Sequence, residues 1–507
     1  MQRFLYFIEK TGNALPHPAI LFLILALITL AFSAIGSLFG WSGVHPATGE
    51  QIEVANLLSR EGIHRIILQM VTNFTGFAPL GIVMVAMLGI GVAESSGLIR
   101  ATINYLLTKT PPACITFMVV FAGVVSSVAA DVGYVLVIPL AGAIFHSLGR
   151  HPIAGIAAGF AGVSGGFAAN IVIAPLDPML AGFSTAAANI IDPDYHVLPT
   201  AYYYFMAVST FLITIVCTLV TVKWIEPRLG KYTGEVEREE IAQPTAWEKK
   251  GLLYAGLVVL GWAIFLAIAL VPEDGFLRGN DGGVLSSPVL RGVITLIFLA
   301  GASVGIVYGY TVGKFTKAED VINSMSDNIK TLATYLVLVF FAAQFVAWFN
   351  WSNLGLLIAI NGASVVKDAN IGLIPLIIIF ITITAFLNLF IGSASAKWAI
   401  VAPIFVPIFM LSGYSPELAQ SAYSVGDSVT NLITPLMPYF ALIIVYCQKY
   451  DKDAGIGTIA ATMLPYTIML YISWTLLLVF WVLLELPLGP GSPLYYIITD
   501  GSGAVTQ

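Results

Sequence analysis

Residues 161–178 have the sequence AGVSGGFAANIVIAPLDP, and this stretch decides the fold. It is too apolar for a surface loop, but its early glycines, Gly165 and Gly166 among them, and the prolines on either side of Asp177 interrupt a helix. Unwound backbone at bilayer depth is tolerated only where it is buried in protein or lines a water-filled cavity, and such broken helices mark substrate and ion sites in secondary transporters. We therefore predict a helix that unwinds inside a membrane, with the carboxyl group of Asp177 in the break.

A second copy of this plan follows about 260 residues later. Residues 128–152 align with residues 392–416 (392−128 = 264), and APLDP at 174–178 aligns with TPLMP at 434–438 (434−174 = 260). Chance recurrence of glycine and proline is the alternative, but spacing and residue types agree over more than forty positions. Paired, interrupted hydrophobic segments in two halves of a chain indicate a transporter binding site.

The repeat predicts how the chain is divided. We expect a first repeat at 1–226, a charged cytoplasmic linker at 227–250, a second repeat at 251–487 and an external tail at 488–507. Inside the repeats we expect hairpins at about 114–148 and 371–411, and broken helices at about 153–191 and 416–448.

Composition excludes a soluble domain. The chain has 58% hydrophobic and 10% charged residues and a mean hydropathy of +0.90, whereas a soluble domain carries about 25% charged residues. The lipid bilayer is therefore its expected environment, and the net charge of −6 without a basic stripe gives no indication of nucleic acid. Cys114, Cys217 and Cys447 are far apart and lie in or beside apolar stretches, so we predict packing residues, with no disulfide, metal site or cofactor.

The expected fold class is an all-α polytopic membrane protein with about nine transmembrane helices plus two re-entrant hairpins, arranged as two inverted-topology repeats with broken helices. The N-terminus lacks the features of a removable signal. Lysine and arginine cluster at the N-terminus and in the linkers, and the tail has neither. The positive-inside rule then places the N-terminus in the cytoplasm and the C-terminus outside.

Three acids lie in or beside apolar segments: Asp131, Asp177 and Asp427. Each costs about 2.5–3.5 kcal/mol at the centre of a membrane helix on insertion scales, so each must face a cavity or a partner. Coupling to an ion or proton is the default interpretation. A carboxylate that braces unwound backbone is the alternative, and for Asp131 both interpretations stay open.

Small and polar residues gather at the predicted tips and breaks: Gly165, Gly166, Asn170, Asn388, Ser393, Ser395 and Asn431. Small residues let two backbones approach, and polar side chains with freed carbonyls can hold a cation or the polar end of a substrate. A sodium site near Asn388 and Asp427 is one such arrangement. Capping of a helix end is the alternative for each asparagine.

Three further features are open from sequence. Trp398 matches Tyr134 in the repeat (398−134 = 264), and these aromatic side chains either stack on a flat substrate or pack in the core. Lys397 is the only basic residue near either tip; it pairs with Asp427, attracts a carboxylate ligand, or extends to the interface. For the tyrosines at 202–204 we predict an interfacial belt.

Several long motifs resemble the p-aminobenzoyl-glutamate transporter (AbgT) family, also described as an antimetabolite or sulfonamide efflux family. They are NFTGFAPLG, FHSLGRHPIAG, GVSGGFAAN, AQFVAWFNWSN, GSASAKWAIVAPIFVP, GDSVTN and LPLGPG. The resemblance covers nearly the whole chain. It implies a homodimer in the bacterial inner membrane, with nine helices and two hairpins per protomer, that moves p-aminobenzoyl-glutamate or sulfonamides using an ion gradient. The family's functional positions fall on Asp177, Asn388, Trp398, Pro416 and Asp427.

One position departs from the family pattern. The family tends to carry an arginine three residues before the second acid, where this chain has Ser424. Either that arginine is dispensable, or Lys397 supplies the positive charge.

The sequence therefore predicts a carrier of a small-molecule substrate, coupled to H⁺ or Na⁺, and no enzyme. A sodium-coupled carrier of another organic anion, of the dicarboxylate type, is the close alternative. An intramembrane aspartyl protease is an alternative of another class, but Leu176-Asp177 and Gly426-Asp427 differ from the Tyr-Asp and Gly-x-Gly-Asp pairs that such enzymes resemble. Two tips that close on one mid-membrane site also suit a carrier better than an ion channel.

Overall fold

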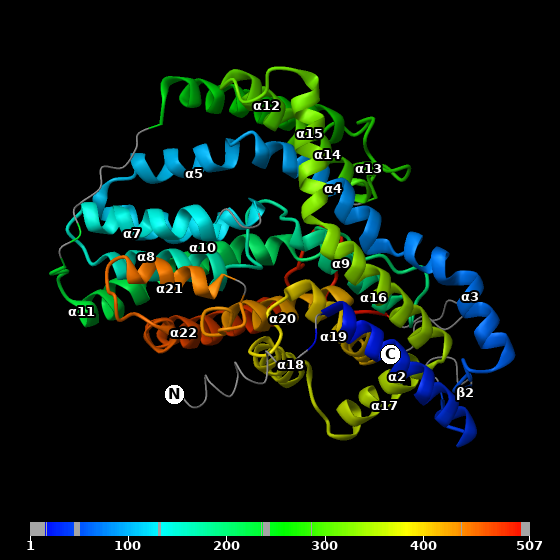
Figure 1. The fold of residues 1–507 in the computed structure, drawn as a ribbon. Helices are drawn as coiled ribbons and strands as arrows, with labels where there is room; N and C mark the ends of the chain where they lie inside the picture. Colours follow the sequence, from blue (N-terminus) through cyan, green and yellow to red (C-terminus); the bar gives the residue numbers. More distant parts are fainter. Residues whose placement is uncertain are drawn as a thin grey trace.

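The computed structural model describes residues 16, 18–44, 51–129, 133–234, 236, 244–284, 286–437 and 439–497. Within this part of the chain, eight helices are long and apolar enough to cross a bilayer. The number rises to nine if one pair of helices, bent by 118°, is taken as a single span. The chain is thus an all-α membrane protein, as predicted, and Figure 1 shows its helices.

The first half contains ten described helices: α2 (Pro18–Leu38), α3 (Arg60–Thr75), α4 (Ala78–Ser95), α5 (Leu98–Lys109), α6 (Ile115–Val125), α7 (Ile138–Ser147), α8 (Pro152–Phe160), α9 (Leu176–Ala188), α10 (Tyr203–Val220) and α11 (Glu226–Leu229). Short 3-10 segments lie at Pro112–Cys114 and Ser126–Ala129, and π-helical segments at Gly133–Val137, Ala161–Gly165 and Thr221–Ile225. Strands β1 (Ser42–Val44) and β2 (Gln51–Glu53) pair antiparallel, with Ser42 opposite Glu53.

The second half contains the remaining described helices: α12 (Ala246–Leu270), α13 (Pro288–Arg291), α14 (Val293–Thr311), α15 (Ala318–Thr331), α16 (Ala333–Trp351), α17 (Leu354–Asp368), α18 (Leu373–Asn388), α19 (Ala394–Leu411), α20 (Pro416–Val429), α21 (Phe440–Gln448) and α22 (Ile456–Leu483).

Both predicted helix breaks are present. In the first half, α8 continues through the π-helical segment to Gly165, and helix resumes only at Leu176, where α9 begins. In the second half, α20 ends at Val429 and α21 begins at Phe440. The described backbone between these half-helices keeps only scattered turn hydrogen bonds, so some of its polar groups are available to side chains or ligands.

Each broken helix lies between two hairpin arms. The arm α6 packs against the Ala161–Gly165 segment and α8, and α7 packs against α8. In the second half, α18 and α19 both pack against α20. The helix α9 packs against α19 and α20 and so joins the halves near the middle of the molecule (Figure 1).

Matching residues of the two repeats adopt matching conformations. Gly149 follows α7 with φ of 74°, and Gly413, at the predicted separation of 264, follows α19 with φ of 86°. This left-handed region favours glycine because a side chain would be strained there. Pro152 and Pro416 each begin the next helix. The exact limits predicted for the repeats, linker and tail stay predictions.

Candidate functional site

Lys397 and Asp427 form a buried ion pair. Their Nζ and Oδ1 atoms lie 2.5 Å apart, and the side chains are 0% and 2% exposed. Lys397 lies in the first turn of α19, and Asp427 in the last turn of α20. The ammonium also donates to Oδ1 of Asn388 at the end of α18. Both hairpin arms and the broken helix therefore meet at one ammonium, and Lys397 pairs with Asp427 in this conformation.

Asn388 fixes the carbonyl end of α20. Its Nδ2 lies 2.5 Å from the carbonyl oxygen of Asp427, 2.9 Å from Oγ1 of Thr430 and 2.8 Å from Oδ1 of Asn431. Asn431 in turn donates to the carbonyl of Ser164 in the first half, at 3.4 Å. The structure therefore brings together three of the predicted site residues, Asn388, Asn431 and Asp427. The hydrogen bond from Asn431 to Ser164 connects this group to the first break.

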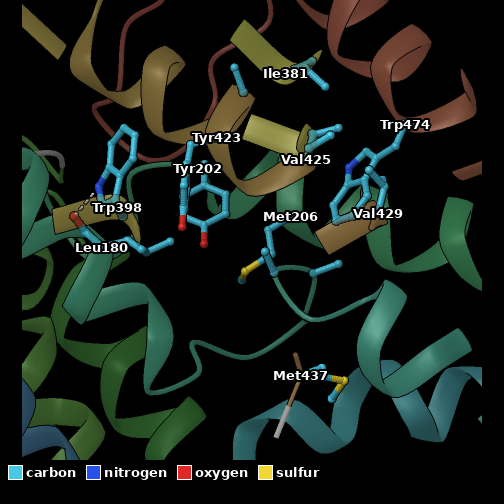
Figure 2. Close-up of a cluster of buried hydrophobic side chains, with 14 of the residues drawn as sticks. Leu180, Tyr202, Met206, Ile381, Trp398, Tyr423, Val425, Val429, Met437 and Trp474 are labelled. Atoms are coloured by element: carbon cyan, nitrogen blue, oxygen red, sulfur yellow. Dashed lines mark hydrogen bonds between the residues drawn. The ribbon is translucent and has the colours of Figure 1, made fainter. Parts of the chain in front are cut away.

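Trp398 is completely buried in this conformation. Its Nε1 donates to Oγ of Ser184 at 3.0 Å and to the carbonyl of Leu180 at 3.2 Å, both on α9. Its ring lies against that of Tyr423, with centroids 4.4 Å apart, and Figure 2 shows this contact beside Leu180. Trp398 is thus a packing residue here. Stacking on a substrate requires a movement that uncovers it.

Asp177 is held by hydrogen bonds at the start of α9. It is 2% exposed. Its Oδ2 accepts from the backbone N–H of Ala174, and its Oδ1 from the hydroxyl of Tyr202, both at 2.7 Å. The N-terminal end of a helix carries partial positive charge, which favours a carboxylate in the first turn. The two acids thus sit at opposite kinds of helix end.

The prediction of an interfacial belt is wrong for Tyr202. Tyr204 is 41% exposed, which fits a belt, but Tyr202 is 1% exposed and binds Asp177. Tyr202 also lies within electrostatic range of Asp427 and Tyr423, and Figure 2 shows the two tyrosine rings close together. Nothing in the tyrosine run marks which member turns inward, because the distinction depends on packing against α9 and α20.

The predicted residues of the first break form their own contacts. Asn170 donates through Nδ2 to Oγ of Ser127 at 2.8 Å and accepts at Oδ1 from two backbone N–H groups of the break. An added Cβ on Gly166 would lie 2.6 Å from the Gly162 carbonyl oxygen, so backbone packing explains this glycine, whereas a Cβ on Gly165 would meet only side-chain atoms, the nearest at the end of Leu470, at 2.7 Å.

Tyr134, the repeat partner of Trp398, is also packed. Its hydroxyl lies 2.8 Å from Oγ of Ser164, and its ring stacks on Tyr439 with centroids 4.4 Å apart. The packing interpretation therefore applies to both tip aromatics in this conformation.

The side chains of the other predicted residues have other roles. Ser393 caps α19 by accepting from the N–H of Ala396, and Ser395 is half-buried. Pro416 begins α20, eleven positions before Asp427 (427−416 = 11), which is about 16 Å along a helix at 1.5 Å per residue. Asp131 lies outside the described residues.

A polar stripe along α20 was missed from sequence. Glu417, Gln420, Ser424 and Asp427 follow helical spacing, and none is more than 3% exposed. Oε1 of Gln420 accepts from Oγ of Ser184 at 2.6 Å. The 3-4-3 spacing was the available signal, since such a polar face on a membrane helix turns inward. Ser424, where the family tends to have arginine, is one member of this stripe.

The three cysteines are free thiols, two of them buried. Among the described residues, no group of three or more His, Cys, Asp and Glu side chains is arranged to hold a metal ion.

Comparison with known proteins places these features in a family. The family model of the AbgT transporter family matches residues 3–496. The p-aminobenzoyl-glutamate transport protein of Escherichia coli (strain K12) is 38% identical over 485 residues, which cover 96% of this chain and 95% of the relative.

Two solved structures share the fold along nearly the whole chain. The Alcanivorax borkumensis YdaH transporter is 45% identical with a TM-score of 0.90, covering 94% of this chain and 100% of that chain. Neisseria gonorrhoeae MtrF, whose structure illuminates a class of antimetabolite efflux pumps, is 49% identical with a TM-score of 0.92, covering 97% and 100%. With a family model that matches almost every residue and relatives of this identity and coverage, the chain belongs to the AbgT transporter family.

Proposed function

We propose that this chain is a secondary active carrier of p-aminobenzoyl-glutamate, sulfonamide-type antimetabolites, or both, driven by a proton or sodium gradient. The relatives' names supply p-aminobenzoyl-glutamate and antimetabolites as substrate classes, and the family resemblance adds sulfonamides. The observation that carries the proposal is the buried ion pair of Lys397 and Asp427 where two hairpin arms meet a broken helix. Burying two charges is costly, so their presence at a helix break supports a role in binding and coupling.

The groups around this pair suit an aromatic acid. Trp398 and Tyr423 offer ring faces within the same cluster as the ammonium of Lys397. Benzoyl and sulfonamide compounds are flat, and p-aminobenzoyl-glutamate also carries carboxylates that an ammonium can attract. All three side chains are fully buried, so substrate entry requires an alternating-access movement that uncovers them.

A proteoliposome flux assay tests this function. Both substrates are offered under imposed pH or sodium gradients, in both directions, to wild type, Asp177→Asn and Asp427→Asn. We expect gradient-driven, saturable flux in wild type and none in either variant. Tyr204→Phe is the matched control because Tyr204 is 41% exposed. Normal coupled flux in both aspartate variants would refute the assignment.

A sodium-coupled carrier of another organic anion is the second candidate. The combination of a fixed cation, asparagine amides and freed backbone also suits a dicarboxylate. In the same assay, saturable flux of dicarboxylates with no flux of benzoyl or sulfonamide compounds would favour it.

The contacts of the two acids argue against a protease. A catalytic aspartate dyad requires two carboxyl groups that share a proton. Here Asp427 is paired with Lys397, whereas Asp177 binds Tyr202 and Ala174.

We infer that the carrier is a homodimer in the bacterial inner membrane, with a cytoplasmic N-terminus and an external C-terminus. Cys114 tests the orientation because it is exposed just after α5, whose Arg100 and Lys109 predict the cytoplasmic side by the positive-inside rule, while Cys217 and Cys447 are buried. A membrane-impermeant maleimide should label Cys114 in inside-out but not in right-side-out vesicles. The reverse labelling would invert the orientation. Light scattering of the purified chain should give twice the protomer mass of 54.2 kDa.

A further inference from the structure

The ammonium of Lys397 occupies a position built from cation ligands. It contacts one carboxylate oxygen, Oδ1 of Asp427, and one amide oxygen, Oδ1 of Asn388. In secondary transporters the C-terminal ends of half-helices and unwound backbone carbonyls coordinate Na⁺, and these two side-chain oxygens lie at such an end, that of α20. Here the chain's own side chain lies between them.

The orientation of Asn388 strengthens this point. Its Nδ2 is directed to acceptors on α20 and the second break, so its Oδ1 is left to face Lys397. An amide held in this way presents its oxygen to a cation and cannot turn its N–H₂ toward Lys397 without losing those bonds. The pocket is therefore organised around positive charge.

The first repeat shows that the two charges belong together. The position that matches Lys397 is Gly133 (397−133 = 264), where an added Cβ would lie 2.3 Å from Oγ of Ser126. The positions that match Asp427 at separations of 264 and 260 are Val163 and Phe167, which are uncharged. At these matching positions the first repeat has neither the acid nor the lysine, and a side chain on Gly133 would collide with Ser126.

We propose that Lys397 is a tethered cation that fills the place of a free monovalent cation between Asn388 and Asp427, so that this site binds no Na⁺ in the wild-type chain. For coupling, the proposal rests on the proposed carrier function: a sodium gradient cannot act through this site. Na⁺ binding at this site can be measured without any substrate. A failure of this proposal is therefore distinguishable from a failure of the proposed carrier function, which is measured as flux.

Removing the ammonium should create a sodium site. Lys397→Met removes the charge and ends one heavy atom short of the ammonium nitrogen, which leaves that position and the oxygens of Asn388 and Asp427 to a free ion. The melting temperature of the full-length protein in detergent is measured with NaCl, KCl or choline chloride at constant ionic strength. We expect no sodium-specific shift in wild type. In Lys397→Met we expect a saturable rise on the order of 3 °C at a hundredfold excess of Na⁺ over its dissociation constant.

Two further variants locate the effect. Lys397→Gln should also gain the shift, which covers failure of the methionine variant to fold. The double variant Lys397→Met/Asp427→Asn should lose the shift because the carboxylate ligand is gone. If neither single variant responds specifically to Na⁺, the proposal is overturned.

Direct ion binding gives an independent measurement. Radioactive Na⁺ should bind to purified wild type no more than to Asn388→Ala, the reference variant in which the site is disrupted. Stoichiometric binding in wild type that Asn388→Ala abolishes would show that Na⁺ and Lys397 share the site, and would also overturn the proposal.

Discussion

The two buried acids, Asp177 and Asp427, are stabilised in different ways because they lie at opposite ends of their respective helices. Asp177 lies in the first turn of α9, where the helix end is partially positive, and it is stabilised by one backbone N–H and one tyrosine hydroxyl. Asp427 lies in the last turn of α20, where the helix end is partially negative. A carboxylate there needs a full positive charge, and Lys397 supplies it. The polarity of the half-helix thus determines the partner each acid requires.

This difference predicts that the second site depends more on charge than the first. At the first site a neutral acceptor can keep some of the hydrogen bonds. At the second site, neutralising one member leaves the other as an uncompensated buried charge. The following changes test this contrast.

Asp427→Asn should have the largest effect. It leaves the ammonium of Lys397 buried without a counter-charge, so we expect a loss of about 3–5 kcal/mol in the free energy of unfolding and no coupled flux. Chemical denaturation in detergent and proteoliposome flux measure the two effects. The double variant Lys397→Gln/Asp427→Asn should recover much of the stability and none of the flux. Equal stability of the single and double variants would show that the pair is not charge-coupled.

Asp177→Asn should abolish coupled flux at a smaller cost in stability. The amide oxygen can still accept from Tyr202 or Ala174, so we expect a loss of about 1 kcal/mol, the value of one hydrogen bond. The same denaturation series compares it directly with Asp427→Asn. A loss as large as that of Asp427→Asn would contradict the helix-end explanation.

Tyr202→Phe should have an intermediate effect on flux. It removes the hydroxyl donor and leaves one oxygen of Asp177 buried without its partner, which costs about 1–3 kcal/mol. We expect flux to fall by about tenfold, the equivalent of about 1.4 kcal/mol, with a shifted pH profile because Asp177 loses a bond to its ionised form. Tyr203→Phe is a control for the aromatic run, since Tyr203 donates to the carbonyl of Ile171 and not to Asp177. An unchanged pH profile in Tyr202→Phe would separate this tyrosine from coupling.

Much of the fold could be predicted from sequence because breaks, repeats and hydrophobic spans are local patterns. The glycines and prolines around Asp177 predicted the first break, and the repeat predicted the second. The partners of the acids could not be predicted in the same way. Lys397 lies thirty positions before Asp427 (427−397 = 30) and Tyr202 lies 25 after Asp177, so each contact depends on how helices pack and not on spacing within one helix.

Trp398 illustrates the same limit. Its place in the repeat predicted a tip position beside the site. Whether its indole faces a substrate or α9 depends on the conformation of the carrier, and here it donates to Ser184 and Leu180 on α9. A sequence pattern therefore identifies such a residue, but it does not tell which partner the side chain contacts in a given conformation of the carrier.

The smallest expected effect tests what the halves share. Gly149 and Gly413 have φ of 74° and 86°, and no atom lies within 4 Å of a Cβ added to Gly413. A side chain at positive φ is strained by about 1 kcal/mol or more. Gly149→Ala and Gly413→Ala should therefore lower the free energy of unfolding by similar amounts, with flux retained. Gly256→Ala, in the middle of α12 with open space around it, should be neutral or stabilising because alanine favours helix. If Gly413→Ala lowered the free energy of unfolding far more than Gly149→Ala, the turn after α19 would have a role that the matching turn after α7 lacks. The two halves would then differ in more than their buried charges.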